Sequence, residues 1–367
     1  MINLQFFPSR RIALYMTRLF LVRSAAVLVA LVGILMMLDL LGKTGAILGH
    51  PGNGDAELWR YVGLRLPQLV SRFLPFAVLL GTLITFAGLN QNSEIISMKA
   101  AGISAHQIIA PLVLASAFVA MIHFAFTERF VTRANAALTA WDNANYGDVP
   151  RETGIQSNVA LVHGDDLIFA DRVIGEGAGV RLAGITFYDR TGGVLRRILT
   201  AQTGAVAPNH GGWILRNATL FTIDAGTQRR IAAVRLGPDI TPDEFTLAQV
   251  VPDEQDYFRL RRSIADLRAT NRATDALEAS LWHKIAGPFS TMLMPLLAAI
   301  AAFGLARSGQ LMVRAVIGMA LGFAYFVADN FALAMGNLGA YPPILAAWGP
   351  FILFLLVGEA VLIRTEE

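Results

Sequence analysis

Six apolar segments dominate the sequence, and each is long enough to cross a lipid bilayer as a helix. A hydrocarbon core about 30 Å thick requires about 20 residues at 1.5 Å per residue. The segments cover residues 17–41, 72–90, 107–126, 284–306, 312–334 and 343–363. Three precede and three follow the stretch 127–283. The sequence therefore predicts a membrane α-helical protein with six transmembrane helices on a 3+3 plan and one large central insertion.

The basic residues of the short loops predict the orientation in the membrane. Only 16% of the residues are charged, which is below the roughly 25% typical of soluble proteins. With the N-terminus inside, one side of the membrane holds Arg10, Arg11, Arg18, Lys99, Arg307, Arg314 and Arg364. The opposite short loops, 42–71 and 335–342, hold fewer basic residues and two acidic ones. Because basic loops stay in the cytoplasm, we expect cytoplasmic N- and C-termini and an extracytoplasmic insertion.

The central insertion changes from helical to alternating periodicity. Apolar and polar residues alternate in 158–163, 167–173, 182–188, 194–200, 213–222 and 230–236, with turn residues between them. This pattern is typical of an antiparallel sandwich or jelly roll, so we expect an all-β, jelly-roll-like domain over 127–255. Helical spacing returns in Asp256–Ala269 and again from Thr274. These stretches predict a helical connector, 256–283, leading to the last three spans in 284–367.

No enzymatic motif stands out in the sequence. The pattern G-x-x-x-x-G-K-[ST] is absent, so any use of ATP and Mg would belong to a partner protein. The chain has no cysteine, which excludes disulfides and thiolate catalysis. The run from His163 to Asp166 could be imagined as a metal site, but a hairpin turn is the better interpretation. We expect no catalytic residue, no metal site and no cofactor in this chain.

A short amphipathic segment, 92–104, separates the second and third apolar runs within the first predicted domain, 1–126. It is too short and too polar to cross a bilayer. Asn92 or Ser93 can cap a helix here, and Gly102 suits its end. Such a helix on the cytoplasmic side predicts a docking element for a partner.

The segment's own residues suggest how it would dock. Glu94 lies in the first turn, where the helix dipole favours an anion. Ile95, Met98 and Ile103 would form an apolar edge that inserts into a groove of the partner. The alternative is an interfacial helix on lipid, for which a single lysine is a weak basic face.

Several charged residues occur within or beside the apolar runs. Asp39 and Lys43 are spaced i,i+4 and share a face if the first helix continues. They form either an interfacial ion pair with a snorkelling lysine or a contact for an anionic lipid. Asp329, inside the fifth span, must face a cavity or another helix, as a structural pair or as part of a substrate path. His123 and Glu128 end the third run and are expected at the membrane interface.

An ordered set of short motifs resembles the lipopolysaccharide export permeases of the LptF/LptG (YjgP/YjgQ) family. The motifs are Asp39-Leu-Leu-Gly-Lys43-Thr-Gly45, Asn92-Ser-Glu-Ile, Ala100-Ala-Gly-Ile-Ser104, Leu281-Trp-His-Lys284 with Pro288, Val313-Arg314, Asp329 and Tyr341-Pro-Pro-Ile344. Each is weak alone, but together they extend over essentially the whole chain. The patterns Asp39…Lys43-x-Gly45 and Trp282-x-Lys284 resemble the LptG branch more closely. Met36 and Gly42 depart from the family pattern, where basic residues are found, so phosphate contacts would be fewer or come from a partner subunit.

The resemblance implies a permease subunit of an ABC-type exporter in the bacterial inner membrane, acting in outer membrane biogenesis. Its implied partners are an LptF-like paralogue, an LptB-like ATPase dimer, and periplasmic LptC- and LptA-like jelly-roll proteins. Glu94 would engage the ATPase, helped by Ile95, Met98 and Gly102, and Lys43 beside Asp39 would lie near the place where the lipid enters.

The insertion would then receive the acyl chains of the lipid. Ile168, Phe169, Ile185 and Phe187 are candidates for an apolar lining of the β domain. The alternative is that these residues form a closed core.

Two other functions remain open from the sequence. One is a permease subunit of another ABC-type envelope lipid or lipoprotein machine, although such subunits typically have four spans. The other is a membrane-anchored enzyme, but 127–283 contains no nucleophile–base or metal constellation.

Overall fold

The structure is a computed structural model that describes residues 9–149, 156–175, 179–207, 212–236, 240, 245, 250–269, 273–303 and 311–366. Arg307 and the end of the fourth predicted span, 304–306, lie outside these residues. The chain divides into two units. One joins Met1–Gly147 to Pro252–Glu367, and the other is Asp148–Val251.

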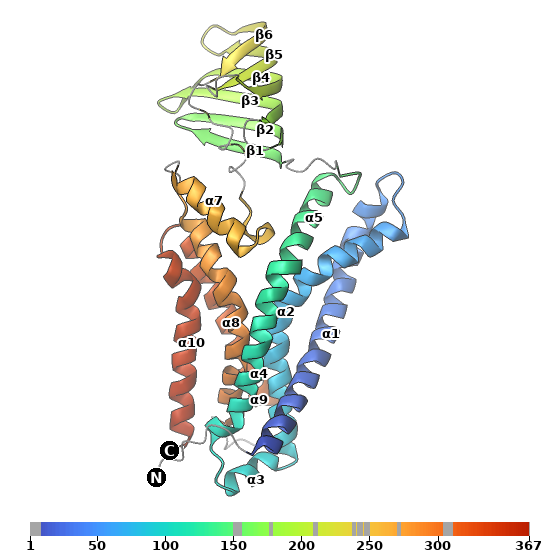
Figure 1. Cartoon of the computed structure of the whole chain (residues 1–367), viewed down its shortest axis with the longest axis vertical. Helices are drawn as coiled ribbons and strands as arrows, with labels where there is room; N and C mark the ends of the chain where they lie inside the picture. The colour runs from blue at the N-terminus through green and yellow to red at the C-terminus, as the bar shows by residue number, and fades with distance from the viewer. Residues whose placement is uncertain are drawn as a thin grey trace. The chain divides into compact units, whose positions relative to one another are not determined.

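The first unit is helical, with six helices long and apolar enough to cross a membrane among the described residues (Figure 1). In chain order its α-helices are α1 (Arg10–Leu48), α2 (Asp55–Gln91), α3 (Glu94–Ala100), α4 (Ala105–Phe126), α5 (Thr132–Asn143), α7 (Tyr257–Ala269), α8 (Asp275–Phe303), α9 (Leu311–Asn337) and α10 (Pro343–Glu366). The expected 3+3 plan around an insertion is confirmed.

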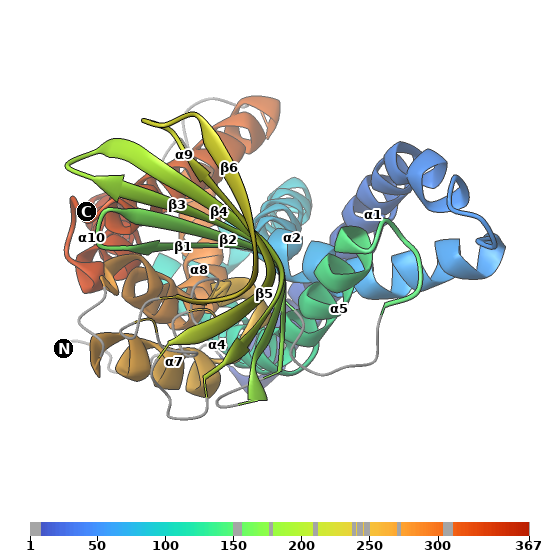
Figure 2. The same ribbon diagram turned by 90° about the horizontal axis from the view of Figure 1, so that it is seen from above.

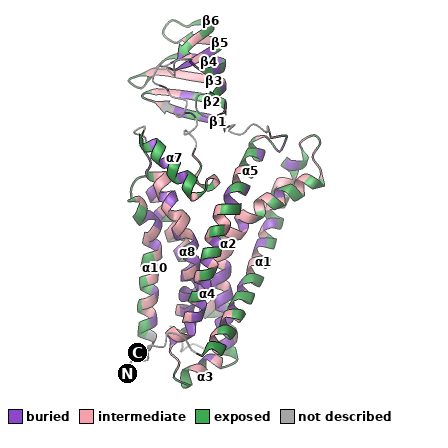
Figure 3. Ribbon diagram, in the orientation of Figure 1, coloured by how far each residue is buried: buried purple, intermediate pink, exposed green. Residues whose placement is uncertain are grey.

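Helix α8 is the centre of the helical unit. It packs against α2, α4, α9 and α10. Of its most apolar stretch of 18 residues, 67% is buried, whereas only 11% of the corresponding stretch of α1 is buried. A helix that is apolar on all sides needs neighbours on all sides or lipid. Figure 3 accordingly shows buried residues gathered around α8 and exposed residues along α1. Helix α1 therefore leaves an apolar surface for lipid or for another subunit.

The third span is longer than the sequence pattern predicts. A five-residue π-helix, η1 (Thr127–Val131), follows α4, and α5 continues the helix to Asn143. Val131, Ala134 and Trp141 are buried, and this apolar side lets the helix extend beyond the purely apolar run. The second unit starts at Asp148, whereas the sequence pattern placed the domain boundary at residue 127.

The second unit is a six-stranded antiparallel sheet. Its strands are β1 (Gln156–His163), β2 (Asp166–Ile174), β3 (Arg181–Thr191), β4 (Val194–Val206), β5 (Trp213–Thr222) and β6 (Thr227–Leu236). They are ordered sequentially from β1 to β6, and Figure 2 shows them twisting strongly from one edge to the other. The inserted β domain is confirmed. The described strands form a meander, without the Greek-key crossovers of a jelly roll.

One face of this sheet carries the core. Val159, Ile168, Ile185 and Leu215 are at most 1% exposed. Trp213 is also buried, and its indole Nε1–H donates a hydrogen bond to the carbonyl of Ile240 at 3.0 Å. The alternating pattern of the sequence has thus placed its apolar residues on one side of the sheet.

The segment from His163 to Asp166 is a hairpin turn, as predicted. His163 pairs with Asp166 across β1 and β2, and Gly164 has a positive φ of 60°. The carboxylate of Asp166 accepts a hydrogen bond from the backbone N–H of Arg190 at 2.8 Å. Asp165 accepts from the backbone N–H of Gly192 at 2.8 Å, so both aspartates fasten neighbouring turns.

Candidate functional site

Helix α3 connects α2 to α4 at the end of the helical unit where α1 begins and α10 ends (Figure 1). It ends in a Schellman motif. The N–H of Ile103 bonds to the carbonyl of Met98 at 3.1 Å, and that of Gly102 to Lys99 at 3.0 Å. Gly102 has a φ of +82°, which glycine adopts without a steric cost. Gly102, the predicted stop, is therefore the residue that terminates α3 just after its last helical residue, Ala100.

The apolar side of α3 packs against its own chain. Ile95 is only 6% exposed, and Met98 and Ile103 pack against the same core of the helical unit. The expectation that these three residues form a free edge for a partner is thus wrong for this fold, because the helix uses them as an anchor. The outward face instead carries Ile96, which is 62% exposed, and Lys99.

Glu94 lies at the start of α3, beside the first turns of α1. Its Oε1 accepts a hydrogen bond from the Tyr15 hydroxyl at 3.3 Å and from the Asn92 amide at 3.3 Å. Ser93 precedes it with a left-handed φ of 58° and no side-chain capping bond, so Ser93, one of the two predicted caps, does not cap the helix. Glu94 is therefore a partly exposed carboxylate held by contacts with α1 and the α2–α3 turn.

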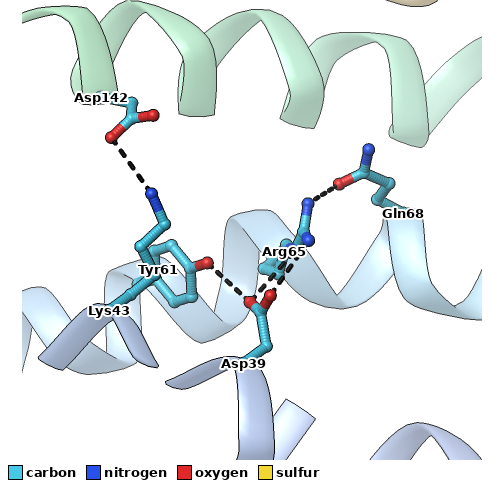
Figure 4. A network of polar contacts seen from close by, with 6 residues as sticks. All are labelled: Asp39, Lys43, Tyr61, Arg65, Gln68 and Asp142. Carbon is cyan, nitrogen blue, oxygen red and sulfur yellow. Dashed lines mark hydrogen bonds and ion pairs between the residues drawn. The ribbon is translucent and has the colours of Figure 1, made fainter. Parts of the chain in front are cut away.

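A polar cluster occupies the opposite end of α1 and α2 (Figure 4). The guanidinium of Arg65 donates to both oxygens of Asp39, from Nε at 3.1 Å and from Nη2 at 3.0 Å. The Tyr61 hydroxyl donates to Asp39 Oδ2 at 2.6 Å, and Arg65 also bonds to Gln68. A planar guanidinium that meets a carboxylate in two bonds is among the stronger polar contacts in proteins. The cluster therefore fixes α1 against α2.

Lys43 does not pair with Asp39, although both lie on α1, which continues to Leu48. Its Nζ is 3.7 Å from Asp142 Oδ1 and 5.9 Å from the centre of the Tyr146 ring. The Lys43 side chain remains 44% exposed. Burial raises the pKa of the Tyr146 hydroxyl, and its hydrogen bond to Asp142 raises it further. The i,i+4 ion pair is thus replaced by contacts to the end of the third span, because Arg65 takes Asp39.

An open polar cavity of about 390 Å³ in the helical unit is lined by residues of α2, α4, η1, α5, α8 and α9, among others. Its polar lining includes Gln68, Arg72, His123, His283, Lys284 and Asp329. The ring Nε2 of His283 lies 3.0 Å from Asp329 Oδ2. Asp329 therefore pairs with a neighbouring helix and lines a cavity, and its role in a substrate path stays a prediction.

His123 and Glu128 do not end the third span, contrary to the expectation, and both are largely enclosed. His123 is 6% exposed, and its Nε2 lies 2.8 Å from the Ser71 hydroxyl. The Glu128 side chain is 15% exposed and lies 3.6 Å from Lys284 Nζ. Both are enclosed because the third span continues through η1 into α5 instead of ending at residue 126.

The candidate lining of the β domain is divided between the two faces of the sheet. Ile168 and Ile185 are buried in its core, and Phe187 packs against that core. Phe169 is 41% exposed and meets the Tyr188 ring edge to face, with centroids 5.8 Å apart. Grouping Phe169 with the others was wrong, because adjacent residues of a strand point to opposite faces.

Sequence reasoning missed the partners that complete these clusters. Tyr61 and Arg65 are spaced i,i+4 on α2, and this spacing signals one shared face. His283 reaches Asp329 across 46 positions of sequence, for which no local pattern exists. Arg72 is exposed beside the cavity and makes no hydrogen bond or ion pair within the described part of the chain. In the same residues, no cluster of three or more His, Asp or Glu side chains could hold a metal ion.

The comparisons with known proteins all identify the same family. The family model "Lipopolysaccharide export system permease LptF/LptG" matches residues 14–364. LptG of Escherichia coli strain K12 is 26% identical over 343 residues, covering 92% of each chain. LptG of Haemophilus influenzae is 26% identical over 358 residues, covering 93% of this chain and 95% of its own. LptF of E. coli K12 is 23% identical and covers 89% and 88%.

Proposed function

Since this chain belongs to the LptF/LptG family and is a permease subunit of a lipopolysaccharide exporter, we propose that a separate ABC-type ATPase drives its transport. The full sequence has no P-loop, so ATP and Mg are bound by the partner and this chain contributes no cofactor site. The proposed assembly contains an LptF-like paralogue, an LptB-like ATPase dimer, and LptC- and LptA-like periplasmic proteins.

In this proposal the protein spans the bacterial inner membrane with both termini in the cytoplasm. The start of α1, helix α3 and the end of α10 lie at one end of the helical unit (Figure 1). Lys99 and Arg364 belong to this end, and basic residues favour the cytoplasmic side. The β unit is inserted between α5 and α7, and its connections leave from the other membrane surface.

Helix α3 is the proposed coupling helix, and its attachment to the core is the observation that carries the proposal. Ile95, Met98 and Ile103 hold it against the helical unit, while Glu94 and Ile96 remain accessible. Gly102 completes the motif that ends the helix. A short helix attached in this way can transmit a displacement to α2 and α4. Glu94 supplies the charge that a basic pocket of the ATPase would recognise.

The lipid path is proposed to begin at the exposed surface of α1. Each acyl CH₂ gains about 0.8 kcal/mol in the bilayer, so extraction of the lipid requires another apolar surface. Helix α1 offers one, because only 11% of its most apolar stretch is buried. Lys43, near Asp39, is placed to meet an anionic headgroup. Asp329 and Arg72 line the neighbouring polar cavity. In the β unit, Ile185 and Phe187 lie on the apolar face that would receive acyl chains.

Copurification tests this proposal directly. The tagged protein is purified from its native membrane in mild detergent beside the Glu94→Lys variant. The wild type should bring an ABC ATPase and a six-span paralogue with it, and the variant should lose the ATPase. Asp55→Lys is a matched control, because Asp55 is exposed and, like Glu94, is an acid in the first turn of a helix.

Two outcomes would contradict the proposal. A wild-type protein that purifies alone in several mild detergents would remove the ATPase-driven mechanism. A Glu94→Lys variant that keeps both the ATPase and lipid export would remove α3 as the coupling helix. Loss of the ATPase from Asp55→Lys as well would point to misfolding and would deny Glu94 its specific role.

A further inference from the structure

We propose that Glu128 is a positioning residue for lipid export, whose carboxylate makes the third span, the fourth span and the connector helix α7 move together. This inference rests on the ATPase-driven mechanism proposed above. It concerns how movement of the membrane helices reaches residues 252–269, the segment in which the chain returns from the β unit to the helical unit.

The two carboxylate oxygens of Glu128 face two different segments. Oε2 accepts a hydrogen bond from the backbone N–H of Tyr257, the first residue of α7. Oε1 lies 3.6 Å from Nζ of Lys284 on α8 and accepts no hydrogen bond within the described residues. Glu128 itself lies in the π-helix η1 of the third span. Three segments that are distant in sequence thus meet at one side chain.

The π-helix explains how a carboxylate reaches this position. A π-turn contains one residue more than an α-turn, which rotates the following helix by about 100°. The chain can then direct Glu128 toward Lys284 while Val131, at the end of η1, and Ala134, in α5, remain buried. Such bulges occur often at functional sites because they interrupt regular helix packing.

A second contact holds the same junction. The side-chain amide of Asn135, one turn beyond η1, donates a hydrogen bond to the carbonyl of Asp253 at 3.3 Å. The short 3₁₀-helix η3 (Pro252–Glu254) packs against α5 and α8. Asp256 caps α7 by accepting from the N–H of Arg259 at 2.8 Å. The beginning of the connector is therefore fastened to the third span at successive residues.

Stability alone does not account for the ion pair. The side chains of Lys284 and Glu128 are only 9% and 15% exposed, and enclosing charges in this way is unfavourable unless the geometry is excellent. Here it is loose, because 3.6 Å exceeds the distance of a charge-assisted hydrogen bond. A shift of α8 by about 0.8 Å would shorten it to about 2.8 Å. The contact can thus tighten when α8 moves and pull on the start of α7.

A charge swap separates this role from a merely structural ion pair. The complex with the ATPase and the paralogue is purified with Glu128→Lys, with Lys284→Glu, and with both. The double variant restores the ion pair, but a lysine at 128 cannot accept the Tyr257 N–H. We expect the double variant to assemble and hydrolyse ATP like the wild type. Its ATP-dependent release of lipopolysaccharide to an LptA-like acceptor should fall about tenfold, a typical coupling between sites.

Release at the wild-type rate by the double variant would overturn the proposal and leave Glu128 as a structural residue. A wild-type complex that shows no ATP-dependent release would instead refute the proposed mechanism, so the two failures are distinguishable. Glu128→Gln provides a further comparison, because its amide oxygen still accepts the Tyr257 N–H but carries no charge for Lys284.

A distance measurement tests the idea even if the swapped variants fail to fold. The chain contains no cysteine, so Phe130→Cys and Phe258→Cys give two spin-label sites on η1 and α7, at residues that are 58% and 68% exposed. In the wild-type background the distance between the labels should be the same in nucleotide-free and ATP-trapped complexes. A change in that distance between the two states would show that α7 moves independently of the third span and would refute the inference.

Discussion

Asp39 has a different partner from the one that its sequence spacing suggests, and this difference decides the chemistry at the C-terminal end of α1. The carboxylate is bound in two bonds by Arg65 and in a third by Tyr61. Lys43 is consequently free of Asp39 and contacts the more exposed Asp142. Asp39 thus fastens α1 to α2, while Lys43, one turn further along α1, keeps an accessible charge.

Replacing Arg65 should destabilise the protein more than replacing Lys43. The Arg65 and Asp39 side chains are 27% and 23% exposed, and a charged hydrogen bond contributes about 1.5–3 kcal/mol. Arg65→Gln should therefore lower the free energy of unfolding by about 2 kcal/mol. Lys43→Gln should cost less than about 1 kcal/mol, as expected of an exposed pair. Thermal unfolding followed by tryptophan fluorescence in one detergent measures both, and an equal loss would contradict the assigned difference.

At the scale of the elements, helix α3 also has one face that anchors it to the core and another that remains accessible. Helix α3 spans only seven residues, and isolated helices of this length are unstable in water. It exists because Ile95, Met98 and Ile103 pack on the helical core and because a Schellman motif closes it. Gly102 is therefore as important for α3 as the residues that face outward.

A Gly102→Ala substitution should weaken ATPase association without affecting the fold. A Cβ at this position would meet nothing within 4 Å, so the cost is that of a left-handed alanine, about 1 kcal/mol. We expect the loosened helix to bind the ATPase about fivefold more weakly, measured by titration of the purified proteins. Gly45→Ala is the control, since its Cβ also meets nothing within 4 Å and alanine favours a helix. Equal affinity for all three proteins would refute this role of Gly102.

At the scale of the whole molecule, one helical unit receives an inserted β unit, and each has its own core. The central helix α8 packs against four other long helices, α2, α4, α9 and α10, and so connects them. Helix α1 is largely uncovered. A subunit built in this way requires lipid or a paralogue along α1, which agrees with a family whose relatives include both LptG and LptF.

Cysteine labelling should show that α3 and the β unit lie on opposite sides of the membrane. Ser97→Cys and Gln228→Cys place single thiols at exposed positions of α3 and β6, in a chain that has no cysteine. A membrane-impermeant maleimide added to spheroplasts should label only the second, and the first should react after lysis. Reporter fusions at residues 100, 310 and 366 should all report a cytoplasmic location. Labelling of Ser97→Cys from outside would reverse the proposed orientation.

The extent of the third span is the clearest case in which sequence reasoning stopped too early. Hydropathy ends near Phe126 because polar residues follow it, but only one side of the continuing helix is polar. Trp141 and Val131 are buried, a pattern that an apolar-run criterion cannot detect. For the same reason hydropathy alone predicts that His123 and Glu128 end the span, whereas the helix continues beyond them. In the β domain, the strand positions follow the alternation closely, and the same alternation puts Phe169 on the opposite face from its neighbour Ile168.

What the sequence by itself determined are the features that depend on local periodicity and on solvent: six membrane helices, an inserted antiparallel β domain, the stop of α3 at Gly102, and the family. These features can be predicted because an apolar run, an alternating strand and a helix-ending glycine are each recognised from residues that are close together in the sequence. Only the tertiary structure decided that Arg65 takes Asp39, that His283 meets Asp329 and that Glu128 joins Lys284 to the start of α7. Each of these contacts connects residues distant in sequence, and which pairs form depends on how the helices pack, which no local pattern records.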